Sequence, residues 1–127
     1  MREIGAAMIE SLKDLGAMVA IVFQCIGAAM LYGIVHDQIT ARVCLEYFSV
    51  WHPPILPHWL NPQSPTDQAL FWGVAATWWM GLFIGVPLSI VARVGSKPPL
   101  SARDLRRPTG LLLITMAVCA LLAGIIG

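Results

Sequence analysis

The stretch that decides the fold runs from Leu15 to Val35 and reads LGAMVAIVFQCIGAAMLYGIV. It has 21 residues, none of them charged, and its single amide is Gln24. A helix rises about 1.5 Å per residue, so roughly 20 apolar residues cross the hydrocarbon core of a bilayer. The segment is therefore predicted to be a transmembrane helix.

Two more segments have the same length and character. Residues 68–92 carry no charge and are interrupted by Pro87, and residues 108–127 are uncharged and begin with Pro108. We therefore predict an all-α membrane protein with three transmembrane helices, at about residues 15–35, 68–92 and 108–127. Pro87 is expected to kink the second helix, because its ring clashes with the carbonyl four residues earlier. Pro108 is expected in the first turn of the third helix, where its missing N–H costs nothing.

The composition agrees with a membrane protein. Hydrophobic residues make up 57% of the chain and charged residues 12%, whereas soluble domains carry about 25% charged residues. A net charge of +1 argues against nucleic-acid binding, which needs a dominant basic face. The three cysteines are spaced for neither a zinc site nor a disulfide framework, and we interpret them as small apolar residues: Cys25, Cys44 and Cys119.

Three segments lie outside these spans in what we take to be a single transmembrane domain. Residues 1–14 form a cytoplasmic amphipathic extension, which either lies along the membrane interface or continues the first helix; the absence of a helix breaker favours continuation. The start is net acidic and the apolar run that follows is longer than that of a signal peptide, so we expect this segment to be retained. Residues 36–67 form a proline-rich loop, and residues 93–107 form a basic loop.

The loop charges predict the orientation. The 36–67 loop has one strong base, Arg42, whereas the shorter 93–107 loop has five. Basic loops stay in the cytoplasm, so the N-terminus is predicted to be cytoplasmic and the C-terminus external. The apolar run continues to Gly127, so either the helix ends level with the membrane or the natural protein is longer. The bases expected to face anionic lipid headgroups are Arg93, Lys97, Arg103, Arg106 and Arg107.

The second span has a regular face of small residues. Helices in lipid associate through close backbone contact at such residues. The four members of this face are four residues apart, and bulky side chains lie on the opposite side of the helix. We predict a groove for another helix on one side and a lipid-facing wall on the other. The small face is Gly73, Thr77, Gly81 and Gly85, and the wall is Trp72, Trp79, Phe83 and Val86.

The other two spans have comparable small faces, which suggests a tight bundle or an oligomer. Gln24 lies on the face of the first span, where its amide either forms one interhelical hydrogen bond or lines a solute path; we favour the hydrogen bond. The face of the first span is Gly16, Ala17, Ala20, Gln24, Gly27 and Ala28, opposite Met18, Val22, Ile26 and Ala29. That of the third is Gly110, Ala117, Ala120, Gly124 and Gly127.

The external loop has the right residue types for a chemical site but no motif. Arg42 and Glu46 are one helical turn apart and can pair, and nearby aromatic residues favour a short interfacial helix. His52 and His58 are candidates for metal binding or acid–base chemistry, but their spacing matches no metal motif. We therefore predict no metal and no cofactor, and an enzymatic role is less favoured than a non-enzymatic one.

The run from Arg42 to Pro54, with Trp72-Gly73, Trp78-Trp79 and Pro87, resembles uncharacterised bacterial multi-pass membrane proteins. The resemblance covers about residues 37–95. It implies a bacterial inner-membrane location and carries no activity or functional residue.

The function remains unknown at this point, and three classes are open. The first is a non-enzymatic accessory or assembly component that packs through its glycine faces, with itself or with another membrane protein. The alternative is a small oligomeric transporter or solute-binding protein, which the absence of charge from the spans disfavours. A membrane enzyme that uses the outer loop is the third.

The orientation predicts the labelling of the two lysines, Lys13 and Lys97. Both are expected on the cytoplasmic side, so a membrane-impermeant amine reagent should leave them unmodified in intact cells and modify them in inverted vesicles. Peptide mass analysis of the purified chain measures this. Modification of Lys97 in intact cells would contradict the orientation.

Overall fold

The computed structural model describes residues 1–51, 64–94 and 97–126. Over these residues the regular structure is entirely helical. Three helical segments are long and apolar enough to cross a membrane: Arg2–Val43, Pro65–Arg93 and Ala102–Ile126. The predicted all-α fold with three membrane-spanning helices is confirmed, although each helical segment is longer than the predicted span.

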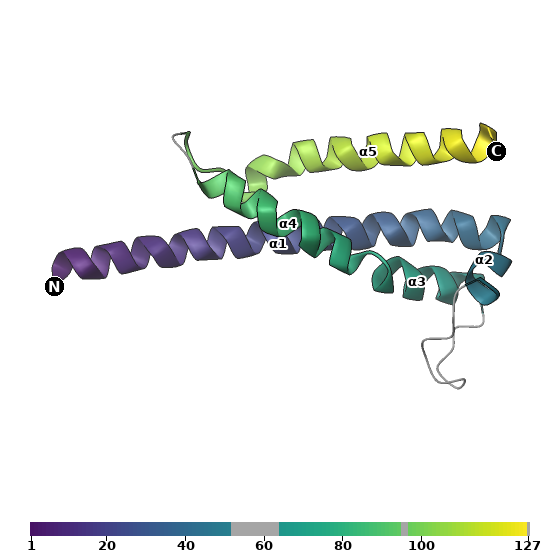
Figure 1. The fold of residues 1–127 in the computed structure, drawn as a ribbon, viewed down its shortest axis with the longest axis horizontal. Coiled ribbons are helices and arrows are strands. Elements are labelled where there is room, and N and C mark those ends of the chain that lie inside the picture. The colour runs from purple at the N-terminus through teal and green to yellow at the C-terminus, as the bar shows by residue number, and fades with distance from the viewer. Residues whose placement is uncertain (52–63, 95–96, 127) are drawn as a thin grey trace.

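Helix α1, Arg2–Val43, forms the long axis of the molecule (Figure 1). Its 42 residues extend for about 63 Å, twice the thickness of a hydrocarbon core. Residues 2–14 continue the first span as one helix. Residues 36–43, predicted to belong to the loop, are also helical, because no proline or glycine interrupts the chain before Cys44.

The second span consists of two helices. Helix α3, Pro65–Ala75, begins where Ser64 Oγ accepts a hydrogen bond from the Asp67 N–H at 3.1 Å and where proline occupies the first turn. Helix α4, Trp78–Arg93, continues through Pro87. The span is interrupted at residues 76–77. There the Thr77 hydroxyl donates to the Gly73 carbonyl at 2.5 Å, a type of bond that bends helices.

The remaining helices are the short α2, Glu46–Ser49, and the long α5, Ala102–Ile126. Helix α2 is the short helix predicted for the outer loop. Helix α5 begins six residues before Pro108, so the prediction that Pro108 lies in its first turn is wrong. The Asp104 carboxylate accepts from the Ser101 N–H at 2.8 Å and from the Ser101 hydroxyl at 2.6 Å, which fixes the earlier start.

The helices form an elongated bundle in which α3 and α4 return along α1 and α5 then runs back parallel to it (Figure 1). One cluster of buried residues joins Ile21 and Cys25 of α1 to Ala92 and Leu105. A second joins Ala41 of α1 to Phe48, Ala69 and Trp72. The two clusters fasten α1 to its neighbours near residues 21–25 and 41.

The backbones of α1 and of the α3–α4 span touch along a glycine seam. A Cβ added to Gly81 would lie 2.5 Å from Ile26 Cα, and one added to Gly73 would lie 2.6 Å from Ile34 Cα. On α1, an added Cβ at Gly33 would lie 2.5 Å from the Gly73 carbonyl oxygen. Glycine is required at these positions because any side chain would force the helices apart.

The face of α1 in this seam differs from the expected one. Helix α4 packs on Val22, Cys25 and Ile26, whereas a Cβ on Gly16 or Gly27 would meet nothing within 4 Å. The close approach is supplied by Gly33, which is not part of the predicted small face. Helix α1 therefore has a second small-residue face that α4 leaves open.

Substitution in the seam should destabilise the bundle. Gly81→Ala places a methyl group against the α1 backbone, and we expect a loss of about 1–3 kcal/mol in the free energy of unfolding, as for other overpacked sites. Gly16→Ala is the matched control, since its Cβ meets open space and alanine is the better helix former. Unfolding in detergent followed by circular dichroism measures both. Equal stability of the two variants would contradict the seam.

Candidate functional site

The contact between α1 and α5 is loose and leaves two grooves. The single buried residue of α5 is Leu105, and none of the residues in its most apolar stretch is buried within the described chain. The first groove, here called the Gln24 groove, lies between Gln24 and Gly27 of α1 and Arg106 and Thr109 of α5. The second, the His36 groove, lies further along both helices.

The His36 groove has a polar stripe on one wall and small residues on the other. The stripe runs along α1 to the residue after its last turn and has members four residues apart, and the α5 wall includes Leu121 and Ile125. The cavity has a volume of about 380 Å³, within the range of small-molecule sites. The stripe is Tyr32, His36, Thr40 and Cys44, and the small residues opposite it are Ala117, Ala120 and Gly124.

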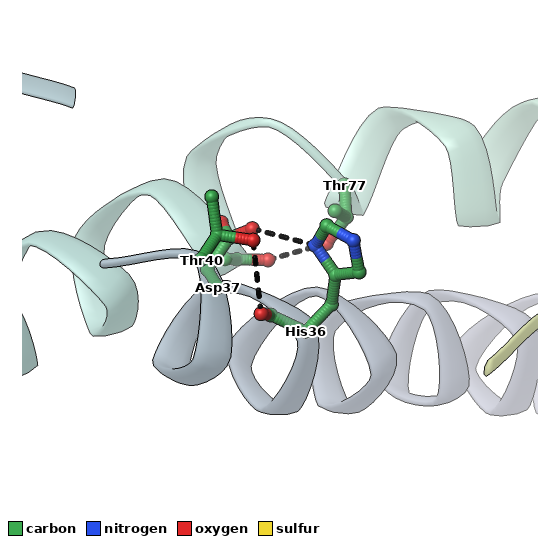
Figure 2. Close-up of polar contacts among 5 residues, drawn as sticks. His36, Asp37, Thr40 and Thr77 are labelled. Carbon is green, nitrogen blue, oxygen red and sulfur yellow. Dashed lines mark hydrogen bonds and ion pairs between the residues drawn. The ribbon is translucent and has the colours of Figure 1, made fainter. Parts of the chain in front are cut away.

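His36 is the most connected residue of the stripe. Its Nδ1 lies 3.1 Å from Asp37 Oδ1, and its ring stacks on Tyr32 at a centroid distance of 5.9 Å. The Thr40 hydroxyl donates to the His36 carbonyl at 3.2 Å. Figure 2 shows His36, Asp37 and Thr40 on α1 together with Thr77 from the α3–α4 break. The contacts with Asp37 and Tyr32 orient the imidazole at the groove.

The grooves reveal that the apolar runs of α1 and α5 are out of register. Leu113 and Leu31 line the Gln24 groove together, and Ile125 and Cys44 line the His36 groove together. The apolar run of α5 therefore lies next to residues from about 25 to 44 of α1, about ten residues beyond the start of the α1 run at Leu15. At 1.5 Å per residue the displacement is about 15 Å.

Arg42 does not form the predicted pair with Glu46, because α1 ends at Val43 and the chain turns between them. Arg42 instead donates to the Gln38 carbonyl at 2.6 Å and the Gln38 side-chain oxygen at 2.5 Å, and to the Thr66 hydroxyl at 3.2 Å. Arg42 thereby connects α1 to the start of α3. The Cys44 thiol lies 3.7 Å from a Glu46 carboxylate oxygen.

Trp72 was predicted to face lipid, but it is buried in the structure. Trp79, Phe83 and Val86 are exposed, but Trp72 is 8% exposed and belongs to the buried cluster of Ala41 and Phe48. Its indole N–H donates to the amide oxygen of the buried Gln68 at 3.1 Å. Ala41 of α1 and Phe48 of α2 pack with Trp72 in this cluster, so the side of α3 that was predicted to face lipid is covered.

An ion pair joins α1 to the end of α4. Arg93 forms this pair with Asp14 and also donates to the Leu100 carbonyl at 3.3 Å. Asp14 and Arg93 directly flank the predicted ends of the first and second spans, at Leu15 and Ala92. The ion pair therefore joins two span ends at one level of the bundle.

Among the described residues, the remaining candidates form no metal site. Gln24 lines its groove, and its amide nitrogen is enclosed without a hydrogen-bond partner among the described residues. His52 and His58 lie outside the described residues. Within residues 1–51, 64–94 and 97–126, no three histidine, cysteine or acidic side chains come together as metal ligands.

Comparisons with protein-family models, with curated proteins and with solved structures found no match for this chain.

Removal of the buried indole should weaken the packing of α3 on α1 and α2. Trp72→Ala is expected to lower the free energy of unfolding by about 3 kcal/mol, because it leaves a cavity and removes the donor to the Gln68 amide oxygen. Trp79→Ala is the matched control, with a residue 50% exposed, and should cost less than about 1 kcal/mol. Thermal unfolding in detergent measures the difference. An equal loss in both variants would show that Trp72 has no special part in the packing.

Proposed function

We propose that this chain is a non-enzymatic assembly component of the membrane that receives a transmembrane helix of a partner protein in the His36 groove. The main support for the proposal is that α5 packs on the bundle near Leu105, whereas the rest of the helix is not buried by the described residues. The glycine seam of the second span is already occupied by α1. It is therefore unavailable to a partner, and the α5 side is the open side.

The walls of the groove suit another helix. Small residues let two helix backbones approach closely in lipid, and Ala117, Ala120 and Gly124 lie on one wall. A Cβ on Gly124 would meet nothing within 4 Å. The hydroxyls of Tyr32 and Thr40 on the other wall can add interhelical hydrogen bonds, which contribute about 0.6 to 2 kcal/mol each in membranes.

The proposed location is a bacterial inner membrane with the N-terminus in the cytoplasm and the C-terminus outside. The basic segment of residues 93–107, which includes the first turns of α5, supports this orientation, since it would lie against anionic headgroups. Arg93 has a different role from the other bases of that segment, because it is paired with Asp14. The proposed headgroup contacts therefore come from Lys97, Arg103, Arg106 and Arg107.

The test is purification in a mild detergent after chemical crosslinking in the membrane. We expect a partner membrane protein in a fixed ratio, and Ala120→Leu should reduce its recovery about fivefold or more by filling the groove, a loss of about 1 kcal/mol in binding. Ala123→Leu makes the same change outside the groove lining and should leave recovery unchanged.

Two results would contradict the proposed function. One is a chain that is recovered as a monomer with no stoichiometric companion. The other is equal recovery of the companion with Ala120→Leu and Ala123→Leu. Recovery of a second copy of this chain alone would replace the partner protein by a homo-oligomer.

A further inference from the structure

The Gln24 groove differs from the His36 groove in the charge at its rim. It has a volume of about 640 Å³ and opens between the first half of α5 and residues 20–31 of α1. Its trough is apolar and is formed by Phe23, Gly27, Leu31 and Leu113. A Cβ on Gly27 would meet nothing within 4 Å, so this part of the trough is not filled by the protein.

The rim carries a positive charge without a counterion. Arg106 lines the groove, and no carboxylate among the described residues forms an ion pair with it. The planar guanidinium presents a fork of N–H donors that matches phosphate oxygens. Thr109 lines the same rim three residues after Arg106, about one helical turn along α5. The ion pairs of the described residues lie elsewhere and join Asp14 to Arg93 and His36 to Asp37.

A hydrogen-bond donor also lies at the groove without an acceptor. The Gln24 amide nitrogen is enclosed and donates to no acceptor among the described residues, although its side chain lines the groove. Buried polar groups in proteins are normally hydrogen-bonded. The terminal torsion of a glutamine side chain is broad, so the amide can turn its N–H₂ group towards a ligand in the groove.

From this geometry we propose that the Gln24 groove binds one anionic phospholipid. Its phosphate lies at Arg106 and Thr109, and one acyl chain follows Phe23, Gly27 and Leu31. The displacement of about ten residues between the apolar runs of α1 and α5 produces this arrangement. It places the basic start of α5 beside an apolar part of α1. Basic pockets between membrane helices recognise anionic headgroups in this way. The site is independent of a partner helix in the His36 groove.

The test uses native mass spectrometry of the full chain released from nanodiscs with equal amounts of phosphatidylglycerol and phosphatidylcholine. We expect one phosphatidylglycerol to be retained in preference to phosphatidylcholine. Arg106→Gln should reduce its retention about fivefold, the contribution of one basic side chain near the membrane surface. Arg107→Gln is the matched control, since Arg107 is the next residue and does not line the groove.

A second variant tests the apolar trough without a change of charge. Gly27→Leu fills the trough and should also reduce the retention of phosphatidylglycerol, whereas Gly16→Leu, outside the groove lining, should not. Thermal unfolding of each variant shows whether it remains folded. Equal retention of the two lipids by the unsubstituted chain would overturn the proposal, as would equal losses with Arg106→Gln and Arg107→Gln, which indicate surface charge alone.

Discussion

The close approach of the α1 backbone to the second span is the constraint on which the rest of the bundle depends. Lipid offers helices no hydrophobic reason to associate, so the association energy comes from packing and hydrogen bonds. Glycines at positions 33, 73 and 81 let the two backbones touch. Once that contact is made, the ends of the pair are fixed. Arg93 reaches Asp14 at one end, and Arg42 reaches Thr66 at the other.

The same contact explains why α5 is only loosely attached. The glycines of the seam are used between α1 and the second span, and α5 has no comparable close contact, since Cβ atoms added at Gly110 and Gly124 would meet nothing within 4 Å. Helix α5 is held near Leu105 and by the connection to α4, where the Leu100 N–H donates to the Ala92 carbonyl at 2.8 Å. Because α5 is attached only near its start, its remaining length leaves the two grooves against α1.

The number and type of the spans were predictable because length and hydrophobicity alone determine whether a helix can cross lipid. The break at residues 76–77 was not, because neither Ala76 nor Thr77 is a helix breaker. At the break the Thr77 hydroxyl donates to the Gly73 carbonyl, a bond that the sequence pattern alone does not show. The burial of Trp72 was missed because it depends on contacts with Ala41 and Phe48, which the periodicity of the second span does not reveal.

The choice of packing face on α1 could not be read from periodicity. Small residues occur on more than one side of this helix, and the seam selects the side with Gly33 because that glycine lies opposite Gly73. The position of α5 along α1 also could not be predicted from the sequence, since it depends on the contact of Leu105 with Ile21 and Cys25. A sequence pattern specifies which residues can approach closely, but the partner helix decides which of them do.

The displacement between the apolar runs of α1 and α5 places ionisable residues at the depth of the hydrocarbon core, and this affects both grooves. A slab of about 30 Å that encloses the apolar run of α5 would also enclose His36 and Asp37 of α1, whereas one that encloses the run of α1 would enclose Arg106. Ionisable groups at such depths need a partner or a route to water. His36 has Asp37 at 3.1 Å, and Arg106 has no carboxylate partner in the described part of the chain. The uncompensated charge among these three groups is therefore that of Arg106 at the Gln24 groove. An anionic headgroup is the ligand that would neutralise it.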